Sequence, residues 1–322
     1  MVGGNKENGS KYAGINYIHH EAYELTLPSV VMPKKRSELK PGKISVFWAE
    51  FVFIFMLHYR KKWVMPWLVI LTVGGVLVYS LLIAFIYFQL PYEPQYARSL
   101  KWVVTLNTLY FTISSNIGCF NFFDHDRNDR LPCAMKTSAI LIISPCAVWF
   151  GRYVAEMPFR IILIVLSTAI VYPIVGMRPG FQWYLLYQLA FILQTFANGA
   201  FGLNVTAICK DEFTATWVAI IFFSFNFIFS GALYTSNTVT WILLWLRYLS
   251  VSFYVGQIGI FSQFYNAIYP NSNITGNDLL DTYGWMKQPL SVSIVGLILL
   301  TLLFNVTGVF FLWLTSRSKK HK

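Results

Sequence analysis

Charged residues are scarce in this sequence. Asp, Glu, Lys and Arg together form 12% of its 322 residues, whereas hydrophobic residues form 56% and the mean hydropathy is +0.53. Soluble domains carry about 25% charged residues. A chain with about half that share cannot cover a water-facing surface, so the scarcity excludes a soluble globular protein. Most of the chain must face lipid, and one membrane domain accounts for its length.

Residue patterns for catalysis and for metal binding are missing as well. None of the five His residues lies in a long apolar segment, and the four Cys residues show no CxxC spacing. A metal centre or a Cys/His pair at membrane depth is therefore not expected. Residues 4–9 have the outer glycine spacing of a P-loop, but Ser10 and Lys11 reverse the required order and no strand precedes them. We expect no catalytic residue, no metal and no ATPase domain in the chain, and therefore no enzyme.

The formal net charge of +11 does not indicate a nucleic-acid partner. Lys and Arg gather in short clusters beside apolar segments, as they do on the cytosolic side of membrane proteins. On that basis most of the 25 basic residues fall on the side that holds both termini. This predicts an integral multi-pass membrane protein with both termini in the cytosol, in the plasma membrane or an internal membrane.

Six segments are long and apolar enough to cross a bilayer, for which about 20 residues are needed. They cover residues 66–88, 102–123, 140 or 149 to 175, 183–208, 214–234 and 289–314. Residues 44–57 are apolar and aromatic but too short to cross, so they predict an interfacial helix. Residues 241–264 are more polar and are typical of a re-entrant helix pair. The expected fold is all-α and integral to the membrane, with six transmembrane helices, an N-terminal interfacial helix and a re-entrant pair before the last span.

The expected domain boundaries follow from these segments. Residues 1–43 are polar and predict a flexible cytosolic segment, residues 44–316 form the transmembrane domain, and residues 317–322 form a basic cytosolic tail. The outer loop after the fifth span carries an N-glycosylation sequon at Asn273. The sequons at Asn204 and Asn305 lie within spans and should stay unmodified.

Arg152, Glu156 and Arg160 place charge in or beside the third span, where charge is costly. Their spacing of four residues puts them on one helical face, so they can pair. For Arg152 and Glu156 we favour a structural ion pair over a substrate contact. For Arg160 a structural role and a gate in the bundle interior both stay open.

The second and fifth spans combine aromatic and polar residues. The second includes Asn107, Thr108 and Phe111, and the fifth includes Phe223, Ser224 and Phe227. Aromatic walls with a few polar groups suit a flat hydrophobic ligand, although small and polar residues also hold membrane helices together. The charged run at residues 124–130, after the second span, is either a solvated loop or a docking element for a cytosolic partner.

Three motifs resemble the ABC-2 type membrane domain of ABC transporters. Residues 153–160, Tyr-Val-Ala-Glu-Met-Pro-Phe-Arg, resemble the acidic-x-Pro-x-basic start of that domain's third helix. Residues 229–233, Phe-Ser-Gly-Ala-Leu, resemble the Phe-Ser-Gly-Leu-Leu end of its fifth helix, and residues 241–264 resemble its re-entrant pair. The likeness covers residues 44–316. More narrowly, it is a resemblance to the G subfamily of half-transporters, which includes pigment-precursor and multidrug or sterol exporters.

The resemblance implies roles for particular residues. A substrate slit between the second and fifth helices of two subunits would involve Thr108, Phe111, Phe223, Ser224 and Phe227. A gate would involve Ala232, Leu233 and Arg160. The inner loop would couple the chain to an ATPase through Asp124, Asp126, Arg127, Asp129 and Arg130.

The resemblance also implies partners. The chain would form a homo- or heterodimer with another G-type half, lie in membrane lipid and bind a hydrophobic substrate. Residues 1–43 stand where the family carries its nucleotide-binding domain, so ATP and Mg would be bound by partner domains and no cofactor by this chain.

These expectations give a permease subunit that moves a lipid, sterol or other hydrophobic molecule. The alternative is a truncated or degenerate family member that pairs with full half-transporters and regulates them without transporting. The missing ATPase domain, and Ala232 in place of a gate leucine, favour that alternative.

Overall fold

The computed structural model describes residues 43–64, 66–120, 144–209, 211–231, 245–269, 274–282 and 289–318. In these ranges the regular structure is helical, apart from one isolated antiparallel bridge between Ile268 and Thr275. The predicted all-α class is therefore confirmed. The large compact unit of the chain is Phe47–Lys322.

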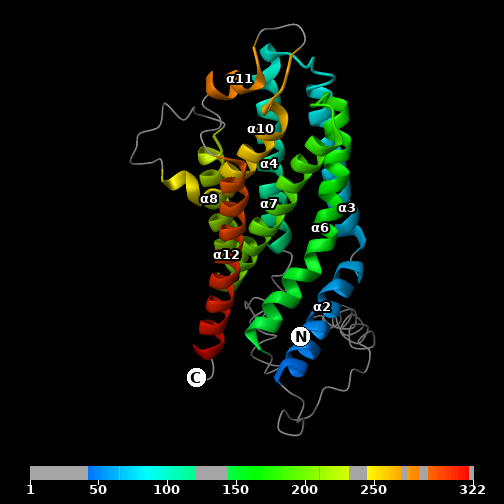
Figure 1. Ribbon diagram of the computed structural model, residues 1–322. Coiled ribbons are helices and arrows are strands. Elements are labelled where there is room, and N and C mark those ends of the chain that lie inside the picture. The colour runs from blue at the N-terminus through cyan, green and yellow to red at the C-terminus, as the bar shows by residue number, and fades with distance from the viewer. Residues whose placement is uncertain are drawn as a thin grey trace, which may run out of the picture. The chain divides into compact units, whose positions relative to one another are not determined.

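Long helices run side by side within this unit, as Figure 1 shows. They are α2 (Lys43–Val64), α3 (Pro66–Ile86), α4 (Ala97–Phe120), α6 (Pro145–Val175), α7 (Phe181–Ile208), α8 (Glu212–Phe229), α10 (Val251–Phe264) and α12 (Leu290–Ser318). Shorter elements are η1 (Pro94–Tyr96), η2 (Leu246–Leu249) and α11 (Gly276–Thr282). The described part of α12 ends at one end of the unit, and α11 lies at the opposite end (Figure 1).

Among the described residues, four helices are long and apolar enough to cross a membrane. They are α6, α7, residues Val69–Ile86 of α3 and residues Leu290–Leu314 of α12. The predicted second and fifth spans do not meet this criterion. α4 carries many polar residues, and the apolar part of α8, Phe213–Phe229, is shorter than 18 residues. The total of six spans therefore stays a prediction. The apolar stretch of α2, Phe47–Met56, is shorter still and suits an interfacial helix.

The start of α6 lies between the two positions that the sequence left open. Pro145 is its first residue, and the hydroxyl of Ser144 accepts a hydrogen bond from the Ala147 N–H at 3.4 Å. The same hydroxyl donates to Glu50 Oε2 of α2 at 2.8 Å. The helix ends at Gly176, whose φ of 78° is a left-handed conformation that glycine adopts readily. The Ser144–Glu50 bond therefore attaches α2 to the first turn of α6.

α7 is the helix around which the others pack, since it contacts α4, α6, α10 and α12. Its buried face carries small residues at Ala197, Gly199, Ala200 and Gly202. Small residues allow helices in lipid to approach closely. Similar contacts fix α10, where Val104 of α4 lies against Gly259 and Tyr254 lies against Gly296 of α12.

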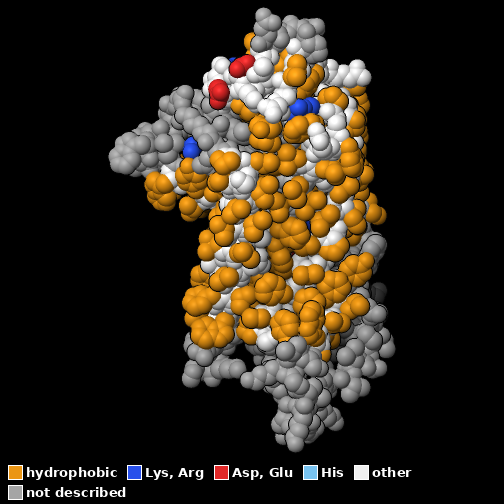
Figure 2. Space-filling view, viewed as in Figure 1, with side chains coloured by type: hydrophobic (Ala, Val, Ile, Leu, Met, Phe, Trp, Pro, Cys, Tyr) orange, Lys and Arg blue, Asp and Glu red, His pale blue; other side chains and the backbone are white. Residues whose placement is uncertain are grey.

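The outer faces of α3 and α12 are apolar and exposed. Phe85 of α3 and Val306 of α12 are each 67% exposed. Figure 2 shows hydrophobic side chains over the flank of the unit, with the Lys, Arg, Asp and Glu side chains of the described residues visible near the α11 end. This distribution is what helices surrounded by lipid require.

Arg178, in the connection between α6 and α7, binds this connection to the C-terminal end of α10 near α11. Its guanidinium lies 3.8 Å from the centre of the Trp183 ring and donates to the Tyr265 carbonyl at 2.6 Å. Its backbone N–H donates to Gln263 Oε1 at 3.0 Å. Because Tyr265 follows the last residue of α10, Arg178 holds the C-terminal end of that helix in place.

Asp278 stabilises the start of α11 beside this contact. Its carboxylate accepts hydrogen bonds from the hydroxyl and the backbone N–H of Thr275, at 2.7 and 2.8 Å. These bonds favour the charged form and lower the pKa of Asp278 below its usual value.

Candidate functional site

The exposed side of α8 carries the predicted fifth-helix residues of the site. Ser224 is exposed, and Phe223 and Phe227 are half-buried beside it. The two rings are stacked with their centres 6.5 Å apart and their planes 11° from parallel. The Ser224 hydroxyl donates to the Ile220 carbonyl at 2.9 Å, which leaves its oxygen able to accept from a ligand. This face offers aromatic surface with one polar group.

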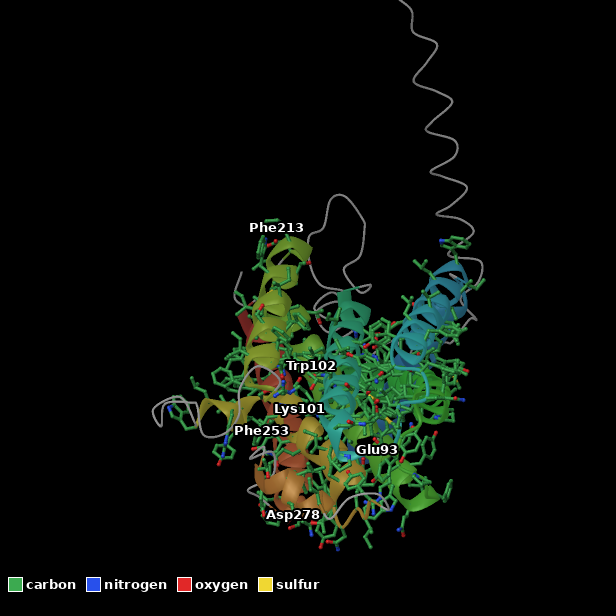
Figure 3. The ribbon with its side chains drawn as sticks, turned by 90° about the horizontal axis from the view of Figure 1, so that it is seen from above. Glu93, Lys101, Trp102, Phe213, Phe253 and Asp278 are labelled. Atoms are coloured by element: carbon green, nitrogen blue, oxygen red, sulfur yellow. The ribbon has the colours of Figure 1, made fainter. Side chains whose placement is uncertain are left out.

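The first turn of α8 is also exposed. Asp211 caps the helix, accepting a hydrogen bond from the Thr214 N–H at 2.8 Å. Phe213 is 72% exposed and Trp217 is 53% exposed. Figure 3 shows Phe213 at the start of α8, pointing away from the other helices. α8 therefore presents a continuous apolar face that the rest of the described chain does not cover.

The opposite side of α8 holds the helix to its neighbours. Phe222 stacks on Phe201 of α7 with ring centres 3.5 Å apart. Asn226 is fully buried and bonds to residues at the start of α10. The side of α8 that carries Phe222 and Asn226 therefore packs against α7 and α10, while the other side faces outward.

Thr108 and Phe111, the predicted second-helix residues, lie in the core instead. They are 1% and 3% exposed. The Thr108 hydroxyl donates to the Val104 carbonyl of its own helix at 2.8 Å, and the Phe111 ring packs 5.4 Å from the Phe191 ring of α7. The structure therefore does not bring Thr108 and Phe111 to the exposed face that carries Phe223, Ser224 and Phe227.

A buried polar cluster joins α4 to α7 next to these residues. Gln194 Nε2 donates to the Thr108 carbonyl at 2.5 Å and to the Thr112 hydroxyl at 2.9 Å. Asn198 Nδ2 reaches the same hydroxyl at 3.2 Å. Sequence reasoning did not single out Gln194 and Asn198. The signal that would have found them is two amides four residues apart, on one face of a largely apolar helix.

Glu156 and Arg160 form a buried ion pair on α6. Arg160 Nη2 lies 2.5 Å from Glu156 Oε2, and the side chains are 10% and 4% exposed. Arg160 Nη1 also donates to the Ser115 carbonyl of α4 at 2.7 Å. The pair therefore links the third predicted span to the second.

Arg152 lies on the same helix and is 2% exposed. It borders a cavity of about 10 Å³ together with Trp149, Thr206 and Leu312, which is room for about one water molecule. The contact shown for Glu156 is with Arg160, and the pairing of Arg152 with Glu156 stays a prediction.

Other predicted site residues lie outside the described ranges. They are the coupling residues Asp124, Asp126, Arg127, Asp129 and Arg130, the gate residues Ala232 and Leu233, and the glycosylation site Asn273. Among the residues that are described, no group of three or more His, Cys, Asp or Glu side chains could hold a metal ion.

Comparison with known proteins places this arrangement in a family. The sequence model described as the ABC-2 type transporter matches residues 49–264. Protein white of Ceratitis capitata is 24% identical over 230 residues, which cover 68% of this chain and 34% of that protein. The broad substrate specificity ATP-binding cassette transporter ABCG2 of Bos taurus is 27% identical over 132 residues, 40% of this chain and 20% of that protein.

A third relative is the ABC transporter ATP-binding protein/permease wht-1 of Caenorhabditis elegans. It is 24% identical over 206 residues, which cover 63% of this chain and 30% of that protein. The chain thus spans about a third or less of the length of these relatives. The family match extends over more than half of the chain. With its apolar helical bundle, the chain belongs to the ABC-2 type transporter family, as a membrane domain related to the G-subfamily ABC transporters.

Proposed function

We propose that this chain is a membrane-spanning permease subunit that moves a lipid, sterol or other hydrophobic molecule. ATP would be hydrolysed on a nucleotide-binding domain that acts with it, where Mg would also be bound. Membership of the ABC-2 family and the names of the relatives, which include an ATP-binding protein/permease, support a transport role. The proposal for the substrate rests on the aromatic face of α8 that holds Phe223, Ser224 and Phe227.

The substrate class follows from the chemistry of that face. Stacked rings offer apolar area to a flat molecule, and the Ser224 oxygen offers one hydrogen bond to a hydroxyl group. A second G-type half, either another copy or a different chain, would supply the facing wall. Thr108 and Phe111 would then support the slit from the core of this subunit, since both are buried.

Coupling to ATP would enter at residues 124–130. Asp124, Asp126, Arg127, Asp129 and Arg130 follow α4 in the chain and precede α6. A movement of this segment would be transmitted to α4 and α6, because the hydrogen bond from Arg160 to the Ser115 carbonyl connects these two helices. In this scheme both termini lie in the cytosol with the nucleotide-binding domains.

Phe223→Ala and Phe227→Ala are expected to weaken binding of the fluorescent sterol dehydroergosterol to the purified chain in nanodiscs. Each loses a ring that stacks on the ligand, so each should raise the Kd about fivefold to tenfold. Phe85→Ala is the matched control, because Phe85 is 67% exposed on α3, away from the proposed face of α8.

The three variants separate the possible outcomes. Equal effects at Phe223, Phe227 and Phe85 would show that the sterol merely dissolves in the lipid around the protein. If the unmodified chain binds no sterol but co-purifies with a G-type half-transporter and changes its transport rate, the regulatory alternative replaces the permease.

The orientation predicts one glycan on this chain in a eukaryotic secretory pathway. Asn273 lies outside in the proposed topology, whereas Asn204 and Asn305 are buried in helices. Gel mobility before and after glycosidase treatment should show a single shift that Asn273→Gln abolishes. A shift that survives this substitution, or that requires Asn204 or Asn305, would contradict the topology.

A further inference from the structure

The start of α10 lies inside the unit, beside α8, and its first N–H groups need partners other than solvent. The first N–H groups of a helix have no acceptor within the helix itself. Here the Ser250 hydroxyl accepts from the Phe253 N–H at 3.3 Å. Figure 3 shows Phe253, which marks this first turn near α8.

Asn226 of α8 supplies the second acceptor. Its Oδ1 accepts from the Ser252 N–H at 3.0 Å and from the Ser250 hydroxyl at 3.1 Å. Its Nδ2 donates to the Phe222 carbonyl at 2.9 Å. Asn226, Ser250 and Ser252 are all 0% exposed. One side chain of α8 therefore caps the N-terminal end of another helix, with both ends of its amide bonded.

These hydrogen bonds mean that Asn226 does more than fill space between α8 and α10. A buried amide costs free energy unless it is hydrogen-bonded, and a leucine would fill similar space among apolar neighbours without that cost. The amide oxygen also faces the positive end of the α10 dipole, which strengthens the contact. The bonds therefore define one height and one rotation of α8 relative to α10.

α10 provides a fixed reference for this alignment. Tyr254 lies against Gly296 of α12, and Gly259 lies against Val104 of α4. Arg178 holds its C-terminal end through the Tyr265 carbonyl. α8, in contrast, has a broad exposed face, so its position depends on fewer contacts.

We propose that Asn226 is a positioning residue, which aligns α8 on the first turn of α10 and so places Phe223 and Phe227 for the ligand. Asn226 follows Phe223 by three residues and precedes Phe227 by one, so a slip or a rotation of α8 moves both rings. The inference rests on the proposed function, because it concerns the same face of α8. It adds a residue that touches no ligand but controls the site.

The test compares three variants in nanodiscs by hydrogen exchange and by dehydroergosterol binding. Asn226→Leu keeps the volume and removes the acceptor, so exchange of the peptide covering residues 250–256 should rise and the Kd should increase about fivefold. Asn226→Ser should give the same result, because a serine hydroxyl bonds its own helix and is too short to reach Ser252. Asn226→Asp keeps the acceptor and should restore protection of this peptide and affinity toward the unmodified values.

Asn305→Leu is the matched control, since Asn305 is also a buried Asn with a bond across helices, to Trp149 Nε1 at 3.0 Å. It should leave exchange at residues 250–256 and sterol affinity unchanged. Unchanged exchange in Asn226→Leu and Asn226→Ser would overturn the inference, and so would raised exchange with unchanged affinity. If the unmodified chain binds no sterol, the sterol as substrate and the positioning role of Asn226 for it fail together, whereas the exchange result still decides whether Asn226 caps α10.

Discussion

The Glu156→Leu variant is expected to lose about 3–5 kcal/mol of folding free energy, the cost of removing one partner of a buried ion pair. Arg160 would keep its bond to the Ser115 carbonyl but lose the carboxylate 2.5 Å away. A guanidinium in a membrane interior without a counter-charge is costly. Thermal unfolding of the purified protein in nanodiscs should show a large fall in Tm.

The double variant with Glu156→Leu and Arg160→Leu is the control for this change. Replacing a whole buried pair by apolar residues is often close to neutral, because neither charge then has to be desolvated. The double variant should therefore recover most of the Tm that the single variant loses. A double variant as unstable as Glu156→Leu would show that the bond from Arg160 to α4, and not the ion pair, holds these helices together.

The Gly308→Ala variant is expected to lose about 1–3 kcal/mol of folding free energy, as other overpacked cores do. A Cβ at Gly308 would lie 2.0 Å from the Trp149 ring of α6. This ring cannot move aside freely, since it is 4% exposed and its Nε1 donates to Asn305 Oδ1 at 3.0 Å. α12 would have to move away from α6, and the Tm should fall.

Gly75→Ala is the matched control, because a Cβ at Gly75 of α3 meets no atom within 4 Å. It should leave the Tm unchanged or raise it slightly. Adding Trp149→Phe to Gly308→Ala should return part of the lost stability, since the smaller ring leaves room for the methyl group. Equal Tm values for Gly308→Ala and Gly75→Ala would contradict the close contact between α12 and α6.

Several boundaries in the bundle could be predicted from hydropathy alone. The fourth span was expected at residues 183–208 and α7 is Phe181–Ile208, while the sixth was expected at 289–314 and α12 is Leu290–Ser318. Long apolar runs are reliable because a segment in lipid must satisfy its backbone polar groups internally, and a helix does so. The start of α6 was less certain, and the Ser144 cap before Pro145 decides it.

The roles of single side chains were harder to predict. Thr108 and Phe223 were assigned to one slit, yet the first is 1% exposed and the second is half-buried on α8. Gln194 was not singled out, although it bonds two residues of α4. In a soluble protein a polar face marks the outside of a helix. In lipid the outer face of a helix is apolar and polar residues can lie inside, so polarity does not show which face is exposed.

The sequence by itself determined that this chain is a helical membrane protein, because scarce charge and long apolar runs allow no other solvent than lipid. Its match to the ABC-2 type transporter family at residues 49–264 determined the family. Only the tertiary structure decided which polar groups meet across helices, such as Asn226 with the first turn of α10 and Arg160 with the Ser115 carbonyl of α4. The physical reason is that such contacts depend on the rotation and depth of each helix against its neighbours. Those two quantities are set by close packing and not by hydropathy.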